Sequence, residues 1–427
     1  MKNVVLVSVV LILAACSASS PPGAVAGGGD KAVNSIAGPI TRRSQDFRAH
    51  DGDHKRAPSL DGAYARFIAR YKLYPNRYWV APKSSDQGCS QSRPCPDERR
   101  ERRASDRNKG SQSSPWATIE YASAHTPPCA VIWVADGNYD AVTTKGDGDP
   151  SCHKTFVSQN YGGAKINGTV NSRGAFVDFV GFEVTAPSSC TGFIGPGWPG
   201  PGSISYSYSN TFAYNRVHDI DNASGAPACN GIGGMAGGQL YYGNVIWNIG
   251  TNGNRHVHGI YADLGAIVEN NVVYNTTGGC IHVGRNPAHV TVVNNTLYNC
   301  KWGVVLYTMS GSVTPSGNYV ANNIVANASQ YGIIECYATD CAGTPGGQST
   351  YTNNITYNAP NRMENGVLLN TSTANPNVVS AGSPAAGADY HLRAGSSASG
   401  AGNRTKAPQF DIDGNTRGNP PSIGAYE

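Results

Sequence analysis

The densest group of ionisable and aromatic residues in the repeated part of this 427-residue chain is segment 255–263, with the sequence RHVHGIYAD. His282 and Arg285 follow about one repeat later, and Lys301 and Tyr307 lie beyond them. Histidine changes its charge near neutral pH, tyrosine carries a hydroxyl that donates a proton, and arginine binds carboxylates through two parallel hydrogen bonds. Together these residue types indicate proton transfer on an acidic substrate.

The reaction that this combination favours is β-elimination of a uronic-acid polysaccharide. The proton at C5 of the sugar is only weakly acidic until a cation neutralises the neighbouring carboxylate. A lyase therefore needs a cation, a base with a pKa near neutral, and an acid for the leaving oxygen. The expected catalytic residues are His258, Tyr261, His282 and Arg285. Either histidine is the base, the tyrosine is the acid and the arginine is the cation; Arg255 is an alternative cation and Lys301 an alternative base.

Neighbouring residues are expected to bind the polymer. The expected substrate-binding residues are Arg255, His256, Asp263, Lys301 and Tyr307. The glycine-rich segment 231–238 removes side-chain bulk beside the cluster, which predicts an open trough for an extended chain.

Three other functions stay open. Hydrolysis of a glycosidic bond normally needs two carboxylic acids, and acidic residues are scarce in the repeats. The main candidates are Asp219, Asp221, Asp263 and Glu335. A C5-epimerase shares the first proton abstraction with a lyase. A non-catalytic carbohydrate-binding protein could have the same scaffold, and its histidines and tyrosines would then only pack along the outer sheet.

Calcium is the one cofactor that the sequence suggests. Asp219 and Asp221 lie in the segment VHDIDN, and closely spaced carboxylate oxygens are ligands that calcium prefers. The same aspartates could instead satisfy a turn, so both interpretations stay open.

The elements that position these residues are predicted by a repeat. Six segments begin with asparagine and align with one another, at 215, 244, 271, 295, 323 and 354, so that the period averages about 28 residues. Short β segments with a fixed period are typical of a solenoid, in which stacked coils build one continuous core. Asparagine fits such corners because its amide can hydrogen-bond neighbouring coils and its backbone tolerates the left-handed region.

A second strand follows each asparagine segment. Ile260, Ile281, Val304 and Ile333 form a β-branched column, which predicts that these side chains face the core. Because side chains alternate along a strand, Tyr261 and His282 are then expected to face outward on neighbouring coils.

Two further stretches carry a resemblance to a known family. The segment SPWATIEYA, at 114–122, precedes VADGNY, at 134–139, and the chain ends in DIDGNTRGNPPSIGAYE. These resemble the opening and closing segments of right-handed parallel β-helix proteins of the pectate-lyase-like kind, over roughly 116–427. The resemblance implies an all-β fold, a right-handed parallel β-helix with an N-terminal capping helix, and a final segment that caps the exposed sheet edges. Residues 60–73 also show helical spacing.

The first residues and the cysteines predict the compartment. Lys2, a short apolar stretch and the sequence LAAC ending at Cys16 resemble the signal of bacterial lipoproteins. We therefore expect a lipid on Cys16 and a location in the cell envelope, at the outer membrane. The other ten cysteines suit disulfides in an exported protein. The plausible pairs are 89–95, 336–341, 280–300, 129–152 and 190–229.

The composition limits the partners. Only 14% of residues are charged and the net charge is +4, which does not suggest nucleic-acid binding. We therefore expect a monomer with an acidic polysaccharide as substrate and a membrane contact through the lipid. The expected organisation is a signal peptide (1–15), a flexible tether (16–56), an N-terminal extension (57–112), the β-helix (113–385) and a C-terminal capping segment (386–427).

Overall fold

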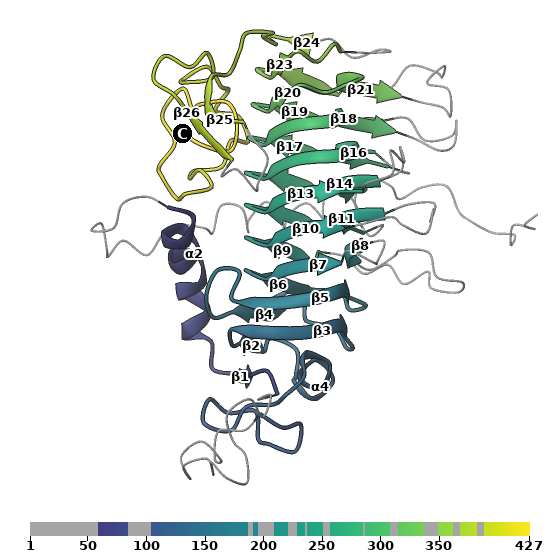
Figure 1. Ribbon diagram of the computed structural model, residues 1–427, viewed down its shortest axis with the longest axis vertical. Helices are drawn as coiled ribbons and strands as arrows, with labels where there is room; N and C mark the ends of the chain where they lie inside the picture. Colours follow the sequence, from purple (N-terminus) through teal and green to yellow (C-terminus); the bar gives the residue numbers. More distant parts are fainter. Residues whose placement is uncertain are drawn as a thin grey trace, which may run out of the picture.

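The strands stack into an elongated solenoid, and the helix at 60–69 and the C-terminal segment lie along one side of it (Figure 1). The computed structural model describes residues 59–83, 104–186, 191–194, 209–220, 229–234, 237–250, 257–284, 287–307, 315–336, 349–361, 368–381 and 388–427. The predicted signal peptide, Cys16 and the tether lie outside these ranges. No helix within the described ranges has the length and apolar character needed to cross a membrane.

Two parallel sheets form the coil. The 11-stranded sheet contains β1 (Arg77–Val80), β2 (Val131–Val134), β4 (Lys154–Ser158), β6 (Val177–Val180), β9 (Thr211–Ala213), β12 (Leu240–Tyr242), β15 (Ile267–Glu269), β17 (Thr291–Val293), β19 (Tyr319–Ala321), β22 (Thr350–Thr352) and β24 (Leu368–Leu369). We call it the first face. Because β1 pairs with β2, the sheet begins inside the segment that was predicted as an N-terminal extension.

The 13-stranded sheet turns a corner and so supplies the other two sides of the coil. Its strands are β3 (Gly137–Thr143), β5 (Ala164–Asn171), β7 (Glu183–Ala186), β8 (Thr191–Ile194), β10 (Arg216–Ile220), β11 (Cys229–Gly233), β13 (Val245–Ile249), β14 (Val257–Ala262), β16 (Val272–Val283), β18 (Thr296–Tyr307), β20 (Ile324–Ala326), β21 (Tyr331–Cys336) and β23 (Ile355–Tyr357). The first half of β16 pairs with β13 and its second half with β14. We call the side with β7, β10 and β13 the second face, and the side with β11, β14 and β21 the third face.

The predicted core column is confirmed. Ile260, Ile281, Val304 and Ile333 pair in register on successive coils and are fully buried. The predicted all-β parallel β-helix is therefore the fold of this chain.

Asparagine serves the coil in two separate ways. The repeat asparagines at 215, 244, 271, 295, 323 and 354 are fully buried. From Asn244 onward, the side-chain oxygen of each accepts from the backbone N–H of the repeat asparagine before it, so that Asn271 accepts from Asn244 at 3.0 Å. The left-handed backbone belongs to other residues, such as Asn270 (φ 58°) just before the repeat asparagine and Asn275 (φ 55°) four residues after it. One ladder thus satisfies buried amides, and the flanking residues turn the corners.

Helices cover the coil where they were expected. Helix α2 (Leu60–Ala69) continues into a 3-10 turn (Arg70–Leu73) and packs on the outside of the first face with Tyr64 and Phe67. Helix α4 (Ile119–His125) begins after Thr118, whose hydroxyl accepts from the N–H of Tyr121, and lies at the N-terminal end of the coil (Figure 1).

The C-terminal segment lies elsewhere than predicted. Instead of crossing the last sheet edge, it packs along the side of the coil, where Tyr390, Ile412 and Ile423 cover apolar side chains of the second face (Figure 1). Its short hairpin consists of β25 (Val378–Ser380) and β26 (Asp389–Leu392). The physical reason is that the later coils carry apolar side chains on the outside of the second face. Covering them removes more apolar surface from water than covering the short edge strands would.

Two of the predicted disulfides are confirmed. Cys129 bonds to Cys152 with the two Cα atoms 4.8 Å apart, and Cys280 bonds to Cys300 with the Cα atoms 5.6 Å apart. Each of the other three predicted pairs includes a cysteine outside the described residues.

Candidate functional site

The structure brings four of the predicted site residues together on the outside of the third face. We call them the third-face ring cluster: His258, Tyr261, His282 and Tyr307. The His258 and His282 rings stack with centroids 4.1 Å apart, and the Tyr261 ring stacks on His282 at 5.0 Å. Tyr307 lies 5.8 Å from His282. As predicted, Tyr261 and His282 pair in register on neighbouring strands and face away from the core.

Two glycines make this close stacking possible. A Cβ atom on Gly284 would lie 2.0 Å from the hydroxyl of Tyr261, so no larger residue fits there without moving the ring. A Cβ on Gly279 would lie 3.2 Å from Nδ1 of His258. The glycines thus let the tyrosine and the histidine lie flat against the next coil.

The backbone also fixes the protonation pattern of His258. The N–H of Gly279 donates to Nδ1 of His258 at 3.0 Å, so this nitrogen is an acceptor. In the neutral ring the proton must then be on Nε2, which makes that edge a donor. Of the two candidate bases, His282 is therefore the one the structure favours, and His258 is placed to donate a hydrogen bond.

The rings are mostly covered. His258, Tyr261 and His282 are only 3%, 7% and 9% exposed, although alternation turns them outward. Burial lowers the effective dielectric around the cluster, which strengthens electrostatic interactions between the rings and any charge near them.

Two other predicted residues lie at the margins of the cluster. Asp263 caps the turn after β14, because its side chain accepts from the N–H of Leu264 at 2.8 Å. The Nζ atom of Lys301 lies 4.9 Å from the ring centroid of Trp302, on the coil after His282. The predicted residues Arg255, His256 and Arg285 lie outside the described residues.

The predicted open trough beside the cluster is wrong for the glycines that the structure describes. These residues are buried, and a Cβ on Gly231 would lie 2.7 Å from the carbonyl oxygen of Gly259. A Cβ on Gly234 would lie 2.5 Å from the side-chain nitrogen of Gln239. The space at Gly231 is therefore filled by the next coil, and the space at Gly234 is filled by the side chain of Gln239.

The carboxylates named for hydrolysis are dispersed. Asp219 is exposed at the end of β10, Asp263 caps a turn, and Glu335 is buried in register with the core residue Leu306. Asp221 lies outside the described residues. The three described acids are therefore on different parts of the coil, which does not favour a pair that flanks one glycosidic bond.

The described part of the proposed calcium site is Asp219, and both of its carboxylate oxygens accept hydrogen bonds. Oδ2 of Asp219 accepts from His218 at 2.8 Å and its Oδ1 accepts from Asn248 at 3.0 Å. The hydrogen bonds from Asn248 and His218 lower the pKa of Asp219 although burial opposes them. No group of three metal-binding side chains occurs among the described residues.

Sequence reasoning missed a charged cluster on the second face. Glu183 accepts from Lys165 at 3.2 Å and from Arg216 at 3.1 Å, and His218 stacks on Trp247 with centroids 4.1 Å apart. The repeat alignment contained a signal for this cluster. In the column of Arg216, later repeats carry apolar residues or threonine, and in the column of His218 they carry aromatic residues or alanine.

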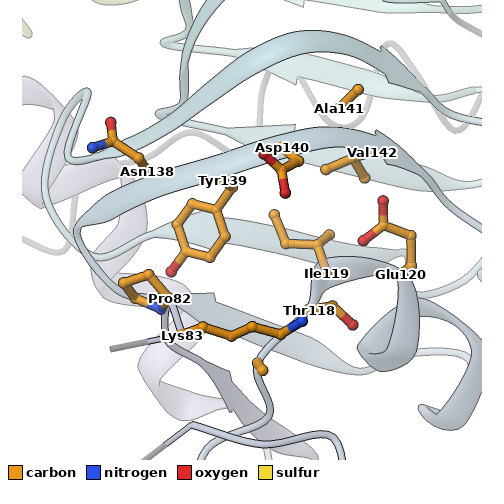
Figure 2. Close-up of a pocket in the computed structure, with 11 residues that line it drawn as sticks. Pro82, Lys83, Thr118, Ile119, Glu120, Asn138, Tyr139, Asp140, Ala141 and Val142 are labelled. Atoms are coloured by element: carbon orange, nitrogen blue, oxygen red, sulfur yellow. The ribbon is translucent and has the colours of Figure 1, made fainter. Parts of the chain in front are cut away.

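A separate cleft of about 450 Å³ lies at the N-terminal end, between α4 and β3 (Figure 2). Lys83, Glu120 and Asp140 contribute charges to its lining. Glu120 is already engaged, because its Oε1 accepts from the N–H of Thr143 at 3.1 Å. No histidine is among the described residues that line the cleft, so we place the candidate proton-transfer site on the third face.

Comparisons with known proteins give likenesses of fold. Similar solved structures include the pectate lyase Pel9A, at 15% identity over 82% of this chain and 96% of that chain with a TM-score of 0.44. XylC in complex with xylose matches at 9% identity over 82% and 98%, with a TM-score of 0.43. An alginate lyase from Paenibacillus sp. str. FPU-7 matches at 13% identity over 59% and 96%, with a TM-score of 0.36. No family model and no curated protein matches the chain.

Proposed function

We propose that this protein degrades an acidic polysaccharide, as a lyase that cleaves uronic-acid polymers by β-elimination on the third face. The observation that carries the proposal is the contact between the rings of His258, His282 and Tyr261 on neighbouring coils. Two imidazoles and a phenol in one stack supply a base, a donor and an acid within the length of a single sugar ring.

The roles follow from the geometry. His282 removes the C5 proton, and the electron pair of that C–H bond forms the C4–C5 double bond. The bond between C4 and the glycosidic oxygen breaks, and the hydroxyl of Tyr261 donates its proton to the leaving oxygen. The products are a shorter chain with a new hydroxyl group and a chain that ends in an unsaturated uronate.

The substrate carboxylate needs hydrogen-bond donors or a cation during this step. Among the described residues, His258 contributes an Nε2–H group as one such donor, since its Nδ1 accepts from Gly279. Arg285 and Arg255 are the proposed cations from the sequence, and Asp263, His256, Lys301 and Tyr307 remain proposed contacts for the polymer. Calcium at Asp219 and Asp221 stays a proposal from the sequence, and no step is routed through it.

A C5-epimerase is the second candidate, because it shares the removal of the C5 proton with a lyase. Inversion then needs an acid that returns a proton to the opposite face of the sugar, and Tyr261 lies on the same side as His282, so the ring stack favours the lyase. The two outcomes differ in product, since epimerisation leaves chain length unchanged.

Lipidation of Cys16, an outer-membrane location and a monomeric state belong to the same proposal.

The test is a screen of purified protein against pectate, alginate and glycosaminoglycans. A lyase produces ultraviolet absorbance from the unsaturated uronate and shortens the polymer. A change in the C5 configuration without shortening would identify an epimerase. Polymer binding without either change would leave only the carbohydrate-binding function.

A further inference from the structure

A group of apolar and aromatic side chains lies on the outside of the third face, on the two coils after His282. Val305 and Ile334 pair in register and are each 5% exposed, and the flanking residues Trp302, Tyr307 and Tyr331 pack against them. This cluster is separate from the core, because Val304 and Ile333 next to it face inward. Apolar side chains on the outside of a solenoid do not belong to its core, and such groups often mark a binding surface.

The aromatic part of this group is partly exposed. Trp302 pairs in register with Tyr331 on the next coil, and both side chains are of intermediate exposure. By contrast, Trp247 and Tyr274 on the second face are buried. We call Trp302 and Tyr331 the aromatic platform.

Two contacts hold the indole ring of Trp302 in place. Its Nε1–H donates to the side-chain oxygen of Gln330 at 3.0 Å, and Nζ of Lys301 lies 4.9 Å from its ring centroid. A cation beside a held indole face is a pairing that a uronate sugar can use, since its apolar ring face stacks and its carboxylate binds the ammonium.

The platform is continuous with the proposed catalytic cluster. Val305 pairs in register with His282, and Trp302 pairs with Gly279, whose N–H donates to His258. Trp302 is therefore one coil and three residues away from His282. With a strand spacing of about 4.8 Å and a rise of about 3.3 Å per residue, the separation is about two sugar rings.

We propose that the aromatic platform and Lys301 bind a uronate of the same polymer about two sugars from the bond that is cleaved. This inference rests on the proposed function for its substrate class, and it makes the protein selective for long chains. Short oligomers would reach His282 without reaching Trp302, whereas polymers would occupy both.

The experiment compares Trp302→Ala, Trp302→Phe and Lys301→Gln with the wild type on uronate oligomers of increasing length. We expect Trp302→Ala to raise KM for the polymer about tenfold, while kcat and the rate on the shortest oligomers cleaved stay within about twofold. Trp302→Phe keeps a ring and should recover most of the affinity. Lys165→Gln, on the second face, is the matched control for Lys301→Gln and should change nothing.

A binding measurement separates this inference from the proposed function. In a His282→Ala background, tryptophan fluorescence and affinity electrophoresis with the polymer report binding without turnover. Weaker polymer binding on adding Trp302→Ala supports the platform even if the wild type cleaves nothing. An active lyase whose Trp302→Ala variant shows the same length dependence as the wild type overturns the platform and leaves the lyase intact.

Discussion

Two ladders of rings run along the outside of the coil, and they differ in what lies over them. The second-face ladder passes under the C-terminal segment, where Tyr390 lies 5.1 Å from Tyr274 and 4.8 Å from Tyr298. Its members in register are His218, Trp247, Tyr274 and Tyr298. The third-face ring cluster has two histidines at its centre and continues into a partly exposed platform. The same stacking geometry therefore occurs once as packing and once as a candidate site.

The difference shows that stacked rings alone do not indicate chemistry. In the second-face ladder, burial raises the pKa values of Tyr274, Tyr298 and Tyr390, so these phenols stay protonated and act as hydrophobic surface. Its histidine, His218, contacts Asp219 and stacks on Trp247. In the third-face ring cluster, a backbone N–H sets the tautomer of His258, and His282 is the proposed base.

The largest expected effect separates the two ladders by activity. His282→Ala should lower the rate of uronate release by about 10³-fold, since general-base catalysis contributes about 10²–10⁴-fold. His218→Ala should leave the rate within about threefold, because its ring belongs to the packing ladder. Initial rates on the polymer check both, with circular dichroism to show that each variant is folded. Equal losses in the two variants would remove the distinction between the ladders.

The next effect separates the ladders by stability. Tyr390→Ala should lower the free energy of unfolding by about 3 kcal/mol, since it removes a buried aromatic ring from the cover of the second face. Tyr307→Ala, at the edge of the third-face ring cluster, should cost about 1 kcal/mol or less. Urea unfolding followed by fluorescence measures both values. A larger loss of stability for Tyr307→Ala would contradict the claim that the second-face ladder, and not the third-face ring cluster, serves mainly as packing.

A smaller effect tests the assignment of the acid. Tyr261→Phe keeps the ring against His282 but removes the hydroxyl, so kcat should fall about 10²-fold with KM nearly unchanged. A substrate with a better leaving group should recover part of the lost rate, because the missing proton then matters less. Unchanged kcat would exclude Tyr261 as the acid.

The smallest effect concerns pH and the cover of the second face. His391 contacts Asp413 at 2.6 Å and Asp389 at 2.5 Å, and chiefly the hydrogen bond to Asp413 raises its pKa to about 9. The folded state therefore holds this proton more tightly than the unfolded state, whose pKa is about 6.5. The resulting stability is complete below about pH 6.5 and is lost as the pH rises to about 9.

Because the side chain of His391 is 48% exposed, solvent screening keeps this contribution to about 1 kcal/mol or less. Urea unfolding at several pH values should show it, and His391→Gln should flatten that part of the profile. If the variant keeps the full pH dependence of the wild type between these values, the ion pairs of His391 do not hold the C-terminal segment.

The repeat made much of the fold predictable. The period of about 28 residues and the β-branched column through Ile260 were sufficient to predict the coil, the core and the outward direction of Tyr261 and His282. These features depend on alternation and stacking, which are local or periodic. The split between buried ladder asparagines and left-handed corner residues was not predicted, because both positions carry the same residue type.

The rest depended on contacts that no period encodes. The tautomer of His258 is set by the N–H of Gly279 on the next coil. The trough failed because the next coil fills the space at Gly231 and the side chain of Gln239 fills the space at Gly234. The position of the C-terminal segment depends on which coils present apolar residues outward, as Tyr390 shows. Such long-range packing is decided by the assembled surface and not by the segment itself.

The most direct test of the central claim is a comparison of His282→Ala with wild-type protein on uronate polymers, by the ultraviolet absorbance of unsaturated ends and by product mass. We predict that the wild type releases unsaturated oligomers and that the variant, still folded and still bound to the polymer, releases almost none. Release of the same unsaturated products by His282→Ala at the wild-type rate would contradict the assignment of the third face as the catalytic surface.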